Sequence, residues 1–359
     1  MEWTQDVAVG DWLRERIDDP WRGTMHDAVP RGFAAYARVF HPAYRERPVG
    51  RAWPADGEDA GARAAWEAFT ADGPEIDTER VRWAEVARAF GTTMHPTAQW
   101  GRLIGRTEPY GSGAGPRDTD GWRYDAPREG HLESTDLTAL AQILQAHTTT
   151  PDAGGIAIWE GWGGLVGTMQ VAPSGLFGGG TFGGGLPRRY AEYTPVDQTD
   201  GDAAADAPDG HDDAGSPDAV ANRHRRFVSL SFRDFFNNPF QKPTWQPGVL
   251  SDEISRGPRF TLPNRDYVLF HGGIAEFADD HWAEHVPWQH ASGWPDPASP
   301  SLVWPDDRAW VLVTEIDWDS TIVAGTADLV AAIVADPRLE VAQIPADADL
   351  AWDGDEVNR

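Results

Sequence analysis

The sequence predicts an α+β fold, in which a helix-rich N-terminal part (about residues 1–150) packs with a mixed or antiparallel sheet formed mainly by residues after 150. Amphipathic helical runs are concentrated before residue 150, and short strand-like runs follow it. This order indicates α+β architecture, because a regular α/β sheet would alternate helices and strands. With 40% hydrophobic and 11% aromatic residues among 359, the chain can bury a substantial core, and we expect a single domain over residues 1–359.

The N-terminal part is predicted to contain four helices joined by long irregular segments. Each helix is expected where helix-forming residues recur with an amphipathic period. One connection, residues 102–130, is rich in Gly, Pro, Arg and Asp and is predicted to be a loop. The helices are expected at residues 11–17, 60–71, 81–90 and 136–147.

The sheet-rich part (about residues 151–350) is predicted from six strand-like runs, with two helical runs between the later ones. The strands are expected at residues 156–159, 167–171, 227–233, 267–271, 310–316 and 340–344, and the helices at 275–285 and 326–335.

An acidic segment interrupts the sheet-rich part at about residues 197–220. It contains eight Asp with Ala, Gly and Pro, and it has no Arg or Lys. Such a segment buries too little apolar surface to offset the entropy lost on ordering. We therefore predict a disordered insertion within the domain, with a linker between two domains as the alternative.

The chain has 29 arginines, one lysine (Lys242) and no cysteine. The lack of cysteine excludes thiolate nucleophiles, Cys-ligated metal sites and disulfides. A phosphate-binding, Schiff-base or general-base lysine would have to be Lys242, whose neighbours match no such motif. The net charge of −27 would repel a phosphate backbone, so nucleic acid is not expected as a partner.

The first six residues have neither a basic nor an apolar region of the kind found in signal peptides. No apolar run approaches the roughly 18 to 20 residues of a membrane span. We expect a cytoplasmic protein with no membrane association and no cofactor. A protein partner or a small-molecule ligand remains open.

An apolar run followed by Asp317 and Asp319 has the form DxDxT. Haloacid-dehalogenase-type phosphatases begin with such a motif, in which the first Asp attacks phosphorus and the second is the acid or base. Only 40 residues follow Asp319, which is too few for that fold, and no lysine lies downstream. The alternative is a strand that ends in a polar turn, with both aspartates on one side.

His281 and His285 belong to an HxxEH sequence, the inverted zinc-protease motif, in which two imidazoles share one helix face. Pro287 would end such a helix at once, and the third ligand of that family would fall beyond the last residue. Two solvated histidines on an exposed helix are the competing interpretation. We therefore expect no bound metal, with His281 and His285 as the candidates if one binds.

The segment 159–163 reads WEGWG, so that Trp159 and Trp162 could form an aromatic platform holding the Glu160 carboxylate, as in sugar and nucleoside sites. Tryptophan is equally a core residue, and many of the 18 tryptophans here adjoin prolines, which indicates packed loops.

Several short segments form a set that covers most of the chain. They are VPRGF at 29–33 with HP at 41–42, HTTTPD at 147–152, WEGWG at 159–163, LPNRDY at 262–267, WPDDRAW at 304–310 and TEID at 314–317. In this set the chain resembles a family of uncharacterised proteins from actinobacteria. The resemblance implies no reaction, ligand or catalytic residue.

These observations favour a binding or regulatory protein of unknown function, because no established catalytic motif is complete. The alternative is a hydrolase that uses carboxylates and histidines, with or without a metal. Its catalytic candidates are Glu160, Asp317 and Asp319, and its ligand-binding candidates are Trp159 and Trp162. The two hypotheses differ in whether Glu160 meets the aspartate pair in one pocket.

Overall fold

The computed structural model describes residues 1–19, 22–57, 59–106, 115–170, 244–263, 265–289 and 296–358. Contacts divide the chain into one unit of Met1–Val166 with Gly248–Arg359 and a second unit of Gly167–Pro247. The predicted acidic insertion and the predicted strand at 227–233 lie outside the described residues, and the single domain stays a prediction.

The described elements follow one another as short strands and short helices. The strands are β1 (Glu2–Trp3), β2 (Ala35–Phe40), β3 (Ala43–Pro48), β4 (Ile76–Val81), β5 (Arg123–Asp125), β6 (Gly154–Trp159), β7 (Thr168–Gln170), β8 (Thr244–Gln246), β9 (Phe260–Leu262), β10 (Arg265–His271), β11 (Leu302–Pro305), β12 (Val311–Val313), β13 (Ser320–Gly325) and β14 (Val341–Ile344). The α-helices are α1 (Asp11–Arg14), α2 (Ala60–Asp72), α3 (Trp83–Phe90), α4 (Trp100–Leu103), α5 (Ser134–Leu144), α7 (Asp252–Arg256) and α8 (Ala327–Ala335). The 3₁₀ helices are η1 (Val7–Gly10), η2 (Met25–Asp27), η3 (Gln145–His147), η4 (Ile274–Phe277) and η5 (Trp282–Glu284).

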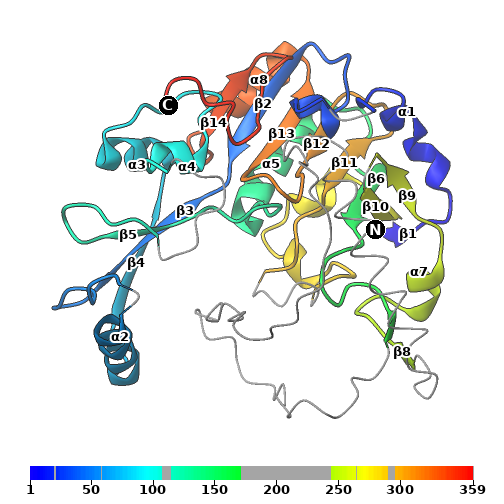
Figure 1. The fold of residues 1–359 in the computed structure, drawn as a ribbon. Helices are drawn as coiled ribbons and strands as arrows, with labels where there is room; N and C mark the ends of the chain where they lie inside the picture. The colour runs from blue at the N-terminus through cyan, green and yellow to red at the C-terminus, as the bar shows by residue number, and fades with distance from the viewer. Residues whose placement is uncertain are drawn as a thin grey trace, which may run out of the picture. The chain divides into compact units, whose positions relative to one another are not determined.

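The first unit is built on an antiparallel sheet, in which nine of the described strands pair (Figure 1). Its order is β1-β10-β6-β11-β12-β13-β2-β14, with β9 on β10. Strand β2, from the first 40 residues, lies between β13 and β14 from the last 40. In the second unit the described residues form the antiparallel pair β7 and β8.

The prediction of a helix-rich N-terminal part is wrong. Strands β1 to β5 all precede residue 150, and sheets dominate the described structure. All six residues of β2 are buried, so this strand lacks the alternation that identifies a half-exposed strand. Strands β3 and β4 carry charged residues that pair across the ladder, as Arg45 does with Glu79 at 2.6 Å and Arg47 with Asp77 at 3.5 Å. A fully buried strand and a strand of paired charges both lack alternating hydrophobic residues, so hydrophobic periodicity does not detect them.

The helices α2, α3, α5 and α8 lie in segments predicted to be helical, but the predicted helix at 275–285 is wrong. That segment forms the separate 3₁₀ turns η4 and η5. Between them, the Asp279 side chain accepts a hydrogen bond from the His281 backbone amide at 2.8 Å. Local side-chain bonds of this kind compete with continued helix. The predicted strand at 310–316 ends at Val313.

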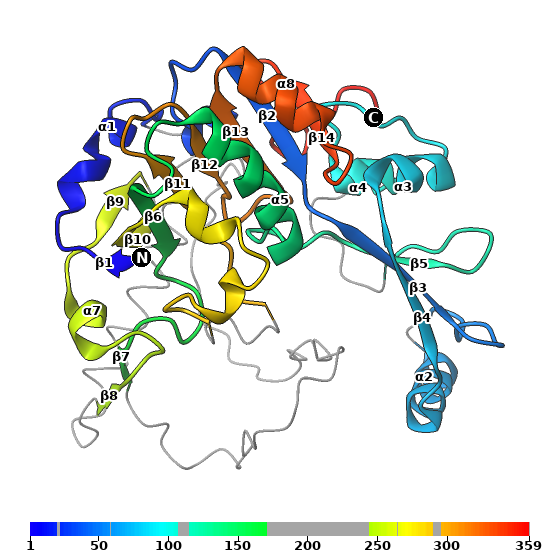
Figure 2. The same cartoon turned by 180° about the vertical axis from the view of Figure 1, so that it is seen from behind.

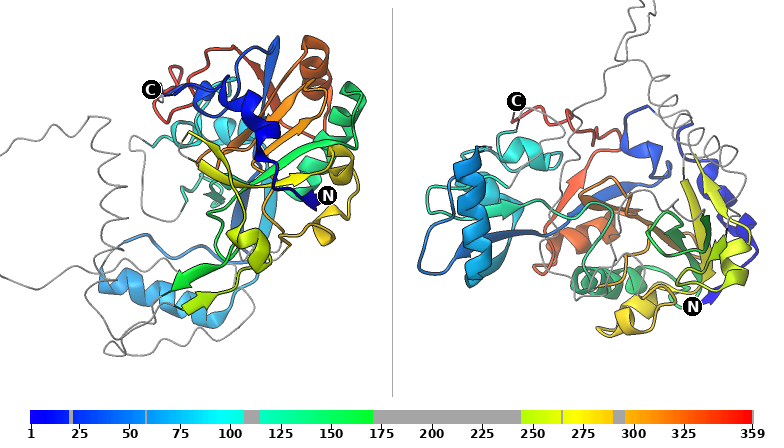
Figure 3. Two further views of the ribbon diagram at one scale, coloured as in Figure 1. Left: turned by 90° about the vertical axis from the view of Figure 1, so that its right-hand side faces the viewer. Right: turned by 60° about the horizontal axis from the view of Figure 1, so that its bottom comes forward.

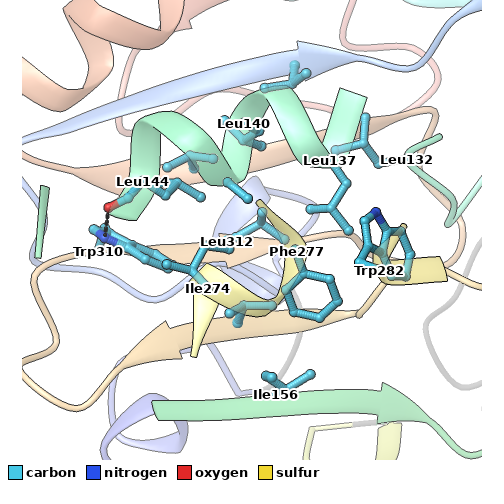
Figure 4. Packing of buried hydrophobic residues seen from close by; sticks show 14 of the residues in the cluster. Leu132, Leu137, Leu140, Leu144, Ile156, Ile274, Phe277, Trp282, Trp310 and Leu312 are labelled. Atoms are coloured by element: carbon cyan, nitrogen blue, oxygen red, sulfur yellow. Dashed lines mark hydrogen bonds between the residues drawn. The ribbon is translucent and has the colours of Figure 1, made fainter. Parts of the chain in front are cut away.

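One face of the large sheet is covered by α5 and α8, as Figure 2 shows. Leu137, Leu140 and Leu144 of α5 belong to the same buried cluster as Ile274 and Phe277 of η4 and Leu312 of β12 (Figure 4). Trp310 adds a hydrogen bond from its indole nitrogen to the Leu144 carbonyl at 3.2 Å. The amphipathic pattern of α5 therefore packs its leucines against the sheet.

The opposite face of the sheet packs against α1, and a three-stranded sheet, β4-β3-β5, continues the fold beyond β2. Phe40 and Ala43 share a buried cluster with helices α3 and α4 at this junction. Both views of Figure 3 show α2 at the end of the β3–β4 ribbon away from the large sheet. None of the helices in the described segments is long and apolar enough to cross a membrane.

Candidate functional site

A cavity of about 190 Å³ lies among α4, the loop between β12 and β13, and the residues that follow β14. Three indoles line it, and we call it the tryptophan cavity. Its polar and aromatic lining includes Arg38, Gln99, Trp100, Arg106, Glu129, Asp317, Trp318, Asp319, Ser320 and Trp352. Of the three carboxylates here, the sequence predicted Asp317 and Asp319.

The loop between β12 and β13 carries Asp317, Trp318 and Asp319. The amide of Gly130 donates to the Trp318 carbonyl at 2.8 Å, and the amide of His41 donates to the Asp319 carbonyl at 3.0 Å. Gly130 has φ +65°, and a Cβ there would lie 2.6 Å from the Ile316 Cα. The segment before α5 can therefore approach this loop only with glycine at 130.

The wall formed by α4 and by Trp352 depends on one buried carboxylate, Asp355. It is completely buried and accepts hydrogen bonds from the Gln99 amide at 3.2 Å and from His95 Nε2 at 2.8 Å. Burial alone would raise the pKa of Asp355, but hydrogen bonds from Asn358, Gln99 and His95 bring it below its usual value. Asp355 thus fixes the segment that contains Trp352 against α4.

Asp319 is held by Arg38, whose guanidinium is almost completely buried. Arg38 Nη2 donates to Asp319 Oδ1 at 3.1 Å, Nε donates to Ser320 Oγ at 2.9 Å, and Nη1 donates to the Ala98 carbonyl at 2.7 Å. Burial raises the pKa of Asp319, although the charge of Arg38 opposes this. Because its donors and charge are engaged, the Arg38–Asp319 pair stabilises the cavity wall rather than offering a free charge.

Asp317 is held differently, by Arg265 at the start of β10. Arg265 Nη2 donates to Asp317 Oδ2 at 2.6 Å and to Glu315 Oε1 at 2.9 Å. Glu315 is buried, and burial raises its pKa despite Arg265. The Asp317 side chain is 69% exposed, so one of its oxygens remains accessible.

Three polar groups that line the cavity have no partner for their side-chain ends in the described part of the chain. The Glu129 carboxylate and the Arg106 guanidinium make neither a hydrogen bond nor an ion pair, and the Gln99 amide oxygen accepts no hydrogen bond. Gln99 is only 7% exposed. Burial, and then the charges of Asp319 and Asp317, raise the pKa of Glu129. Glu129 is exposed and Arg106 is half-buried, so both charges are accessible to a ligand in the cavity.

Glu160 is not among the residues that line the tryptophan cavity. Its carboxylate accepts a hydrogen bond from Arg259 Nε at 2.7 Å. The three predicted catalytic carboxylates are thus each paired with a different arginine, and Glu160 is separate from Asp317 and Asp319. The expected constellation of Glu160 with the aspartate pair is not present in this cavity.

The predicted aromatic platform consists of Trp159 and Trp162, whose ring centroids are 5.9 Å apart at an interplanar angle of 75°. Both are partly buried and pack against hydrophobic clusters on opposite faces of the sheet. The Arg265 guanidinium lies 6.0 Å from the Trp159 ring. These two indoles help to close the core, and they do not line the tryptophan cavity.

His281 and His285 are both exposed and flank the 3₁₀ turn η5. A 3₁₀ turn has three residues per turn, so it does not align residues four apart as the zinc-protease motif requires. His281 Nδ1 instead lies 3.2 Å from Glu284 Oε1. In the described segments no group of three His, Asp or Glu side chains is arranged to hold a metal ion.

Two buried histidines behind the cavity carry no recognisable motif. His41 Nδ1 donates to the Arg128 carbonyl at 2.7 Å, and His41 Nε2 accepts from the Thr321 hydroxyl at 2.9 Å. Burial lowers the pKa of His41 to about 3, and burial lowers that of His131 also to about 3. Both imidazoles are therefore neutral near pH 7, and they belong to the interior rather than to the cavity.

Sequence reasoning missed Arg38, Gln99, Arg106 and Glu129. Arg38 could have been noticed in the sequence, because it is the charged residue in the otherwise apolar and aromatic segment AYARVF. The other three lie in separate loops or at a short helix with no common spacing, so no local pattern identifies them.

Comparisons of the chain with family models, with curated proteins and with solved structures give no match. The resemblance to the actinobacterial family stays a prediction.

Proposed function

We propose that the protein binds a small organic cation in the tryptophan cavity. The observation that carries this proposal is the Glu129 carboxylate, which has no partner in the described segments yet lines a cavity walled by Trp100, Trp318 and Trp352. A carboxylate attracts an ammonium or guanidinium group, and indole faces attract the same groups through cation–π contact. Asp317 adds a second accessible negative charge.

The lining favours an organic cation over a metal ion. Hard ions such as Mg²⁺ and Ca²⁺ require several oxygen ligands in close geometry, which the described acidic residues do not offer as a group. Of the three carboxylates, Asp319 is engaged by Arg38 and Asp317 by Arg265. Indole walls match an alkyl or aromatic ammonium better, since its apolar part can be buried against them.

Hydrolysis is the second candidate, and one observation favours it. The raised pKa of Glu129 would suit a general acid, in a cavity that also holds Asp317 and Asp319. We rank it second because Asp319 is committed to Arg38, and because Glu160 does not line this cavity.

Calorimetric titration with propylamine and phenethylamine tests the proposal. We expect binding by the native protein and at least a tenfold weaker binding by Glu129→Gln, the size of one charge-assisted hydrogen bond. Glu67→Gln on the exposed surface of α2 is the matched control and should bind like the native protein. The proposal would be rejected if neither amine bound the native protein, or if Glu129→Gln bound the amines as tightly as the native protein.

A screen of chromogenic esters and glycosides addresses the second candidate. Turnover that disappears in Glu129→Gln at an unchanged melting temperature would favour the hydrolase over the binding protein.

We also propose that the protein acts in the cytoplasm and does not bind nucleic acid. The net charge of −27 supports the second statement. Cell fractionation and a gel-shift assay at low salt test the two statements separately.

A further inference from the structure

The tryptophan cavity is lined by two opposite charges that do not meet. Glu129 lies in the segment before α5, and Arg106 follows α4. No ion pair joins them, and neither has a hydrogen-bonding partner for its charged group in the described segments. Oppositely charged groups of one cavity that remain unpaired leave a place for a molecule that pairs with both.

The other charges of the cavity do not fill this role. Arg38 and Asp319 form an ion pair, and the other Arg38 N–H groups donate hydrogen bonds to Ser320 and to backbone carbonyls. Asp317 is paired with Arg265. Among the described residues that line the cavity, Glu129 and Arg106 are therefore the charges without a charged partner.

Gln99 offers a further acceptor in the cavity, beside the two charges. It is 93% buried, since 7% of it is exposed, and it lines the same cavity. Its amide oxygen has no donor among the described residues, and its amide nitrogen makes only a long contact of 3.5 Å to the Thr97 carbonyl. An ammonium group bound at Glu129 has three N–H donors, of which one can donate to the Gln99 amide oxygen.

We propose that the ligand is a small zwitterion, whose ammonium group binds Glu129 and Gln99 and whose carboxylate binds Arg106. This inference rests on the proposed function and adds the anionic half of the ligand. A planar guanidinium suits a carboxylate because it can donate two parallel hydrogen bonds. The apolar part of the ligand lies against the indoles of Trp100, Trp318 and Trp352.

A dication that reaches into the neighbouring cavity is less well supported. That second cavity, of about 180 Å³, shares Asp317 and Trp318 with the first and adds Asp27 and Glu315. Asp27 already accepts hydrogen bonds from the amides of Arg22 and Gly23, each at 2.8 Å, and Glu315 is paired with Arg265. A second positive charge would also meet repulsion from Arg106.

Matched ligands test the inference by calorimetry at pH 7. The first set is 2-aminobutanoate, propylamine and butanoate, and the second is phenylalanine, phenethylamine and 3-phenylpropanoate. Within each set the molecules share their apolar part and differ in whether they carry both charges, only the ammonium, or only the carboxylate. We expect the zwitterion of at least one set to bind at least tenfold tighter than its amine and its acid.

Variants assign the two charges. Arg106→Gln should reduce zwitterion affinity to that of the amine while leaving amine affinity the same or higher, and Glu129→Gln should weaken both ligands. Arg88→Gln on the exposed surface of α3 is the matched control for Arg106→Gln.

The outcomes separate this inference from the proposed function. Equal affinity for amine and zwitterion in both sets overturns the zwitterion while the cation-binding proposal stands. An advantage of the zwitterion that survives Arg106→Gln overturns the role of Arg106. Binding of none of the amines or zwitterions overturns both, as does binding of the acids alone with no dependence on Glu129.

Discussion

Arg38 of β2 and Asp319, which directly precedes β13, form an ion pair with an N–O distance of 3.1 Å. The Arg38 side chain is only 1% exposed. The two residues are 281 positions apart in the sequence. Their pairing links the N-terminal and C-terminal thirds of the chain at the wall of the tryptophan cavity.

Asp319→Ala is expected to destabilise the protein by about 3–5 kcal/mol, because it leaves the buried Arg38 guanidinium without its countercharge. Asp72→Ala removes a carboxylate from a pair whose side chains are 35% and 68% exposed, and should cost less than about 1 kcal/mol. Urea unfolding with unchanged m values measures both. Similar losses of unfolding free energy in the two variants would show that burial does not increase the contribution of the Arg38–Asp319 pair.

The stability of the protein is expected to fall as pH decreases from about 6.5 toward 3. His41 and His131 have pKa values of about 3 in the folded state against an ordinary 6.5, so the unfolded chain binds protons first. Each histidine contributes up to about 1.4 kcal/mol per pH unit in this window. The buried carboxylates with raised pKa values, such as Glu315 and Asp319, act in the opposite direction.

The difference between variants isolates the histidine contribution. His41→Gln should flatten the dependence of unfolding free energy on pH, and the exposed His285→Gln should not. Parallel curves for His41→Gln and the native protein would contradict the neutral buried imidazole.

Ligand affinity is expected to decrease as pH falls, because the cation requires the ionised Glu129 carboxylate. The pKa of Glu129 is raised by burial and by Asp319 and Asp317, so protonation sets in above the ordinary range of a glutamate. Binding of an amine should release protons at pH values near that raised pKa. Titrations in buffers of different ionisation enthalpy measure the release, which should be absent in Glu129→Gln.

Asp355→Ala is expected to free the segment around Trp352 from α4. The Asp355 carboxylate is completely buried and accepts hydrogen bonds from Gln99, His95 and Asn358. Its loss leaves buried donors unpaired, at a cost of about 1–3 kcal/mol each. Hydrogen exchange should accelerate at residues 350–358 and 99–103. The exposed Asp353→Ala should leave exchange in both segments unchanged.

Gly130→Ala is expected to destabilise the protein more than Gly121→Ala. Gly130 has φ +65° and Gly121 has φ +81°, so alanine at either position is destabilised by backbone strain of about 1–2 kcal/mol. Only at Gly130 does the new Cβ meet backbone, 2.6 Å from the Ile316 Cα. Comparison of melting temperatures separates the clash from the strain, and equal shifts would show that the loop around Ile316 yields freely.

Local pattern determined several elements of this protein. The alanine-rich run of α2 and the leucine spacing of α5 identify helices, because a helix buries a face that recurs within one turn. Strand β3 was missed because its charges are satisfied by partners on β4, and the sequence of a strand does not identify its neighbour. The likeness of the DxDxT sequence to the phosphatase motif is confined to those few residues.

The absence of cysteine, the single lysine and the charge of −27 are properties of the sequence alone, and the first of them excludes thiolate and disulfide chemistry whatever the fold. The tryptophan cavity is a property of the tertiary structure. Glu129 and Arg106 line one cavity because antiparallel pairing places β2 between β13 and β14, and because Asp355 holds the last residues against α4. Sequence periodicity reports contacts within a few residues, whereas burial and ion pairing act between groups that only the folded chain brings within reach.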